Sequence, residues 1–319
     1  MQIQPKISQN INFQNAKLKK ALELVPETKV SKGLTRLDVA AFKKYVSAIP
    51  YRTGITLDDV KNLKVFNGDK FITNSFKFLC NKLGFSENIR PGLSIVDEMY
   101  HDGFMSYVPA NNIVMVNRTK LKNLSKDQIF ALIRHEIQHY IQNILALRHE
   151  TIGKQAIDIM AENNLKTSIA IAENLFNSLS DQGIKEIYGE MPDVYNFVMH
   201  TKKLYESGNR TAFIDSMKIN SEIYKENLLI WQRKLIDELG QIPKDSALTP
   251  KIKQNFEELQ NTGYYEANGQ INPERYSRSK IEQEAENAQF AAEIEFNPFE
   301  CGIKQIKDAT IQAYSEKYI

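Results

Sequence analysis

Apolar residues recur at helical spacing through most of the chain, and between residues 93 and 116 the recurrence gives way to another pattern. A first helical pattern begins near Leu34 and stops before Pro50, and two shorter ones follow over 58–66 and 74–83. Beyond Ser125 almost every segment has the same periodicity. Helices are predicted there from about ten residues before His135 and then over 152–188, 192–207, 210–239, 251–260 and 277–293.

The interruption has the pattern of short strands. Residues 93–96, 104–108 and 113–116 are apolar runs, and Pro109-Ala110-Asn111-Asn112 between the last two is a strong turn sequence. We therefore expect a small antiparallel sheet, with a hairpin, directly before the long helix that contains His135. The expected fold class is α+β, mostly α-helical.

Composition excludes several classes of function. The chain has 41 basic and 39 acidic residues, closely mixed, so no basic surface for nucleic acid is expected. No run of about 18 apolar residues is present, which predicts no membrane span. The polar N-terminus lacks the apolar core of a signal peptide, so we expect a cytoplasmic protein or one exported without a cleavable signal. Cys80 and Cys301 are far apart and are expected to be two buried thiols.

Candidate metal chemistry lies on the helix that starts at the Ser125 capping box, where residues 135–139 read His-Glu-Ile-Gln-His. Positions i and i+4 of a helix share a face, so the imidazoles of His135 and His139 can reach one ion. Glu136 lies about 100° around the helix from the first histidine. It can take a proton from a water on the metal without being a ligand. The spacing predicts a Zn²⁺ site with Glu136 as general base.

The flanking residues favour a metal site over a chance match. The two histidines share one stripe of the helix with Leu132 and Gln128. A separate apolar stripe is formed by Ile129, Ile133, Ile137, Ile141 and Ile144. Such a helix packs one side into a core and presents its histidines on another. The alternative is a polar helix face in which the pair has no metal.

A third ligand is not adjacent to the histidines. Position 145, where the metzincin pattern places a third histidine, is Leu145, and His149 is expected at a helix end or on the surface. Glu282 and Glu286 lie at i and i+4 on the last predicted helix. Glu282 is the preferred ligand, and Glu286 could hydrogen-bond the far nitrogen of a ligand histidine. Rival ligands are Glu162 and Glu173, and a solvated acidic helix face is a further reading of this stretch.

Two segments, 132–142 and 279–286, resemble the gluzincin metallopeptidases, which use HExxH and a glutamate from a later helix. Glu286 stands where that family more often has Asp or Asn. The resemblance implies a zincin-like fold, Zn²⁺ as cofactor and a peptide or protein substrate. It also implies that an edge strand before the active-site helix, here Asn111 to Asn117, pairs with the substrate main chain.

The expected organisation has a flexible arm over 1–30 and a segment of helices, sheet and HExxH helix over 31–150. A large helical insertion over 151–274 and a third-ligand helix with its tail over 275–319 follow. The expected function is hydrolysis of peptide bonds by a zinc-activated water. Two alternatives stay open: a zinc hydrolase of a non-peptide amide or ester, and a helical interaction protein with a vestigial HExxH. The oligomeric state cannot be predicted.

Overall fold

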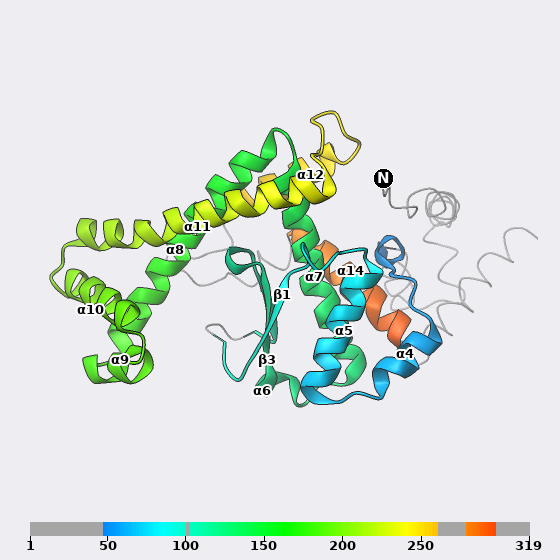
Figure 1. Cartoon of the computed structure of the whole chain (residues 1–319), viewed down its shortest axis with the longest axis horizontal. Coiled ribbons are helices and arrows are strands. Elements are labelled where there is room, and N and C mark those ends of the chain that lie inside the picture. Colours follow the sequence, from blue (N-terminus) through cyan, green and yellow to red (C-terminus); the bar gives the residue numbers. More distant parts are fainter. Residues whose placement is uncertain (1–46, 100–102, 261–278, 298–319) are drawn as a thin grey trace, which may run out of the picture. The chain divides into compact units, whose positions relative to one another are not determined.

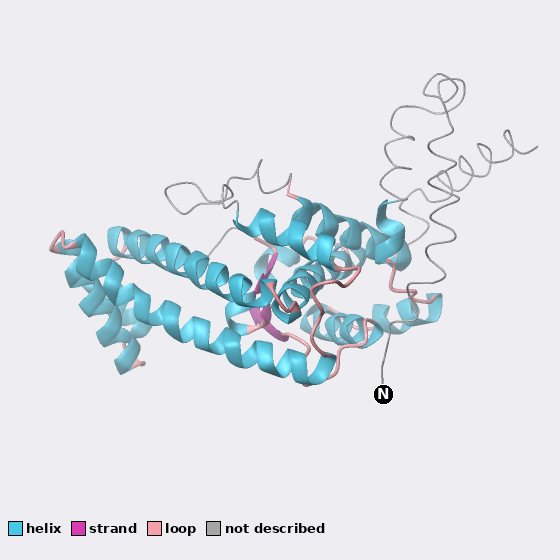
Figure 2. Ribbon diagram, turned by 90° about the horizontal axis from the view of Figure 1, so that it is seen from above, coloured by secondary structure: helices cyan, strands magenta, loops and turns pink. Residues whose placement is uncertain are grey.

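The computed structural model describes residues 47–99, 103–260 and 279–297. The helix expected to begin near Leu34 and the second cysteine, Cys301, lie outside these residues. Helices make up most of the described chain and the strands are few and short (Figures 1 and 2). The mostly helical α+β prediction is therefore confirmed. In the part of the chain that is described, no helix is both long and apolar enough to cross a membrane.

The elements follow the predicted order. Those before the HExxH helix are η1 (Ile49–Tyr51), α4 (Leu57–Lys64), α5 (Gly68–Lys82), β1 (Gly92–Val96), β2 (Met105–Val108), η2 (Pro109–Asn111), β3 (Ile113–Asn117) and α6 (Arg118–Leu121). The later ones are α7 (Lys126–Arg148), α8 (Ile152–Ser178), α9 (Asp181–Tyr188), α10 (Pro192–Glu206), α11 (Arg210–Leu239), α12 (Thr249–Gln260) and α14 (Lys280–Phe296). Two compact units are present. The division between the units falls inside two helices, after His139 in α7 and before Glu284 in α14. Each of these helices is nevertheless unbroken.

Aromatic packing forms the core of the first unit, which contains α4, α5, the N-terminal part of α7 and most of α14. Phe71 of α5, Phe130 of α7 and Phe296 of α14 are all buried. The rings of Phe130 and Phe296 stack with centroids 4.7 Å apart, and Phe71 meets Phe296 edge-on at 6.0 Å. Because burying such rings is a large part of folding free energy, this cluster fixes α14 against the HExxH helix.

The sheet has three strands in the order β1-β3-β2. The hairpin prediction is confirmed: β2 and β3 are joined through η2 and Asn112, whose φ of 49° is the left-handed conformation that asparagine tolerates. The sheet is mixed, however, so the all-antiparallel prediction is wrong for β1, which runs parallel to β3. The expectation that 111–117 forms an edge strand is also wrong, because β3 lies in the centre. In the described sheet, β2 is the edge strand of the hairpin.

The second unit is helical. One helix was expected over 152–188, but α8 ends at Ser178 and α9 begins after Ser180, whose hydroxyl accepts a 3.2 Å bond from the N–H of Gly183. This N-cap supplies the physical reason for the break. The long helices α8 and α11 pack against each other (Figure 1). A core of Ala172, Phe176, Ile184, Phe213 and Met217 joins them to α9.

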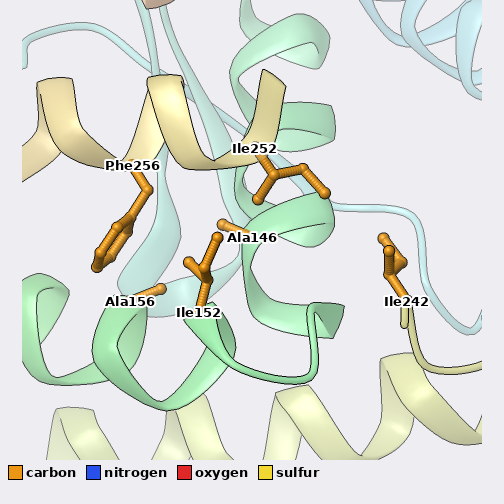
Figure 3. Close-up of a cluster of buried hydrophobic side chains, with 6 residues drawn as sticks. All are labelled: Ala146, Ile152, Ala156, Ile242, Ile252 and Phe256. Carbon is orange, nitrogen blue, oxygen red and sulfur yellow. The ribbon is translucent and has the colours of Figure 1, made fainter. Parts of the chain in front are cut away.

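A second apolar cluster of this unit packs α12 against α7 and α8 (Figure 3). It contains Ala146 of α7, Ile152 and Ala156 of α8, Ile252 and Phe256 of α12, and Ile242 from the connecting segment. His149 lies beside it, at a helix end as predicted but buried. Its Nδ1 accepts the N–H of Ile152 at 3.3 Å, and its Nε2 lies 3.0 Å from Oγ1 of Thr249. These contacts place the proton on Nε2, and His149 thereby connects the ends of α7, α8 and α12.

Candidate metal centre

The HExxH helix and the last helix bring three predicted ligands together. α7 carries His135 and His139 one turn apart, and α14 carries Glu282 in its first turn. One ligand atom from each of the three residues lies within 4.8 Å of the others. His135 and Glu282 are buried and His139 is half-buried. Among the described residues, this is the group of three or more His, Cys, Asp or Glu side chains that could hold a metal ion.

The two imidazoles lie close enough together to bind one metal ion. Their Nε2 atoms lie 3.1 Å apart, and their ring planes are inclined at 79°. In a tetrahedral zinc site with Zn–N bonds of about 2.05 Å, two nitrogen ligands are separated by about 3.3 Å. The observed separation therefore fits one zinc ion. Two imidazole nitrogens and a carboxylate oxygen are also the donor set of many catalytic zinc sites, which keep a fourth position for water or substrate.

Glu136 follows His135 on α7, and its buried carboxylate bonds the backbone of β2. Its Oε2 accepts a 2.7 Å hydrogen bond from the backbone N–H of Tyr107. The residue is 6% exposed, so a hydrogen-bond donor at this position compensates for much of the hydration that the carboxylate loses. The bond fixes one carboxylate oxygen and thereby sets the direction of the other.

The strand register shows which side of β2 faces Glu136. The N–H of Asn117 bonds the carbonyl of Phe104, which pairs these two residues across the hairpin. In an antiparallel pair, alternate residues direct their backbone groups to the partner strand, so those of Met105 and Tyr107 point away from β3. The N–H that reaches Glu136 is therefore on the outer edge of β2.

The first turn of α14 is held by side chains from two directions. Ser279 caps the helix, because its Oγ accepts a 3.1 Å bond from the N–H of Glu282. From α7, Nε2 of Gln142 donates a 2.9 Å bond to the carbonyl of Ile281. Glu282 thus occupies the third position of the helix, which a capping-box glutamate also takes, and one of its carboxylate oxygens lies in the ligand cluster.

A buried charge lies next to His135 in the sequence and anchors the far end of α14. Arg134 is 3% exposed, and this burial lowers the pKa of its guanidinium to about 10. The negative charge of Glu295 acts in the other direction and raises that pKa. Its Nη2 donates a 3.0 Å bond to Gln138. Glu295 also accepts bonds of 2.8 to 2.9 Å from the N–H and hydroxyl of Thr53 and the N–H of Gly54. This network ties α7, α14 and the segment after η1 together.

The structure separates the remaining candidates from the cluster. Glu286 is exposed and makes no hydrogen bond to either histidine within the described residues, so the predicted contact with a ligand histidine is absent there. Glu162 is exposed and forms a 2.7 Å ion pair with Lys166. Glu173 pairs with Arg210.

Sequence reasoning missed two groups that support the site. The donor to Glu136 is a backbone N–H, which no residue type identifies. Gln142 lies one turn after His139, on a helix whose neighbours could not be known. Comparison with known proteins adds nothing to these observations, because no protein-family model, curated protein or solved structure matches the chain. The chemistry of the site therefore has to be argued from its own geometry.

Proposed function

We propose that this protein is a zinc-dependent metallopeptidase of the gluzincin type. The observation that carries the proposal is the convergence of His135, His139 and Glu282 from two helices, with Glu136 next to His135 on the same helix. A polar helix face without a metal does not require a glutamate from a distant helix to approach both histidines in a buried setting. The arrangement of donors and base matches what metal-assisted hydrolysis needs.

His135, His139 and Glu282 would hold the ion. A zinc ion bound there supplies Lewis acidity, lowering the pKa of a water towards 7 and polarising a carbonyl group. Glu136 takes a proton from the attacking water as the new C–O bond forms. It then gives a proton to the amine nitrogen as the C–N bond breaks. The hydrogen bond from Tyr107 keeps the carboxylate of Glu136 aimed during both transfers.

A peptide substrate is supported by the edge of β2. The backbone groups of Met105 point outward from the hairpin, beside the N–H of Tyr107 that Glu136 occupies. An extended peptide that adds to such an edge is held by main-chain hydrogen bonds, which align a scissile amide along the strand. A small ester or amide would gain nothing from this edge, so the peptide is the favoured substrate class.

The test is metal analysis and proteolysis with the full chain and Glu136→Gln. We expect about one zinc per chain in both proteins, because Glu136 is not a ligand. Turnover should fall by at least about a hundredfold in Glu136→Gln, since the amide cannot accept the proton. The amide oxygen can still accept the bond from Tyr107, which makes this variant conservative.

Two results would contradict the proposal. If the purified chain holds no stoichiometric zinc and gains no activity when zinc is added, the HExxH is vestigial and the helical interaction protein is the better reading. If the zinc-loaded chain cleaves small esters or amides and no peptide, the zinc site stands and the peptidase assignment fails.

A further inference from the structure

We propose that Glu258 of α12 is a positioning residue for the zinc ligand Glu282. The proposal rests on the zinc site proposed above and deepens it. It gives the helical insertion a part in metal binding, because α12 belongs to that insertion. Glu258 acts through the backbone of α14 and touches neither the metal nor the substrate.

The contact is a carboxylate cap from one helix on the start of another. Oε2 of Glu258 accepts hydrogen bonds from the backbone N–H groups of Lys280 and Ile281, the latter at 3.2 Å. The next N–H, that of Glu282, is taken by Oγ of Ser279. These three N–H groups have no acceptor within their own helix, and leaving them without one would destabilise the first turn. A carboxylate also interacts favourably with the positive end of a helix.

α12 is a firm support for this cap. Ile252 and Phe256 pack into the apolar cluster of Figure 3, so one face of α12 is fixed against α7 and α8. At its first residue, Oγ1 of Thr249 contacts the buried His149. Glu258 lies on a different face from Phe256 and is half-buried, whereas its neighbour Glu257 is exposed.

The position of Glu282 depends on this first turn. Helix ends fray readily, and a ligand in the first turn moves with them. Here the turn is held from α12 by Glu258 and from α7 by Gln142, which bonds the carbonyl of Ile281. Because a metal site tolerates errors of only about 0.5 Å in its ligands, loosening one support should weaken metal binding.

The experiment compares Glu258→Ala and Glu258→Gln with Glu257→Ala, each in the full chain. Zinc affinity is measured by competition with a chromophoric chelator, and the visible absorption of the cobalt-loaded protein reports the ligand geometry. We expect Glu258→Ala to weaken zinc binding about 10- to 100-fold, as loss of a supporting contact typically does, and to change the cobalt spectrum. Glu258→Gln should recover most of both, because its amide oxygen can accept the same bonds. Glu257→Ala should behave as the wild type.

The outcomes separate this inference from the proposed function. If the wild type binds zinc and Glu258→Ala has the same affinity and cobalt spectrum, the positioning role is overturned and the zinc site stands. If the wild type binds no zinc, the proposed function itself fails. If Glu258→Ala does not fold, Glu258→Asp provides the test, because it keeps the charge but withdraws the oxygen by one methylene. Weaker zinc binding in that variant supports the role, and unchanged binding overturns it.

Discussion

The backbone N–H of Tyr107 donates a 2.7 Å hydrogen bond to Oε2 of Glu136. The donor is on the outer edge of a strand and the acceptor is on the helix that carries both histidines. One contact therefore connects the edge at which we propose a peptide binds with the residue that we propose moves the proton. The register of the hairpin turns this N–H outward, and the N–H in turn fixes the direction of the Glu136 carboxylate.

Removing this donor should lower turnover without removing the metal. Tyr107→Pro lacks the N–H, and an edge position is one of the few places in a sheet where proline is tolerated. Because a hydrogen bond to a charged group contributes about 1.5 to 3 kcal/mol, kcat should fall about tenfold to a hundredfold. Zinc content should not change. Tyr107→Val, which keeps the N–H and loses the ring, is the matched control, and equal kcat in the two variants would contradict the role of the N–H.

The third ligand can be identified by comparing three glutamates. Glu282→Ala should weaken zinc binding by at least about a hundredfold, because a carboxylate ligand is lost from a site with three protein ligands. Glu162→Ala and Glu173→Ala should bind zinc as the wild type does, since each forms an ion pair elsewhere. Chelator competition measures all three. A large loss in Glu162→Ala with none in Glu282→Ala would reverse the assignment.

Glu286 provides a test of the resemblance. Its side chain is exposed, so Glu286→Ala should leave zinc affinity within about twofold of the wild type, as is usual for a surface substitution. A tenfold loss would instead show that Glu286 orients a ligand histidine. The measurement is the same chelator competition.

The buried Arg134 and the nearby Glu295 predict a coupled effect on the free energy of unfolding. Glu295→Ala removes the acceptor of three hydrogen bonds and leaves the charge of Arg134 uncompensated. We expect the free energy of unfolding in urea to fall by about 2 to 4 kcal/mol. Adding Arg134→Met should restore part of that loss, because the uncompensated charge is removed as well. A double variant less stable than Glu295→Ala would contradict this account.

Cys80 predicts an alkaline effect. Burial raises the pKa of its thiol from 9.0 to about 12. Above about pH 9 the unfolded chain loses this proton while the folded protein keeps it. The free energy of unfolding should therefore decrease between about pH 9 and 12, by up to about 1.4 kcal/mol per pH unit. In a Cys301→Ser background, urea unfolding of the Cys80 protein and of Cys80→Ala over this range isolates the effect, and parallel pH curves would refute it.

The local parts of the site could be predicted from the sequence. The spacing of His135 and His139 places them on one face of any helix, and the apolar stripe beside them predicts that helix without knowledge of its neighbours. The same holds for the hairpin, where the turn sequence between two apolar runs is enough. Glu282 could be proposed as a ligand because it lies on a predicted helix, but the sequence left Glu162 and Glu173 open.

The sequence by itself determined a mostly helical α+β chain with a histidine pair and a glutamate on one helix. Only the tertiary structure decided that β3 lies in the centre of the sheet and β2 at its edge. It also decided that the N–H of Tyr107 bonds Glu136 and that Glu258 caps the first turn of α14. The physical reason is the range of the interactions. Periodicity encodes which face of a helix or strand is buried, whereas strand order and helix capping depend on backbone hydrogen bonds between segments far apart in the chain. Backbone groups are the same in every residue, so no pattern of side chains reveals their partners.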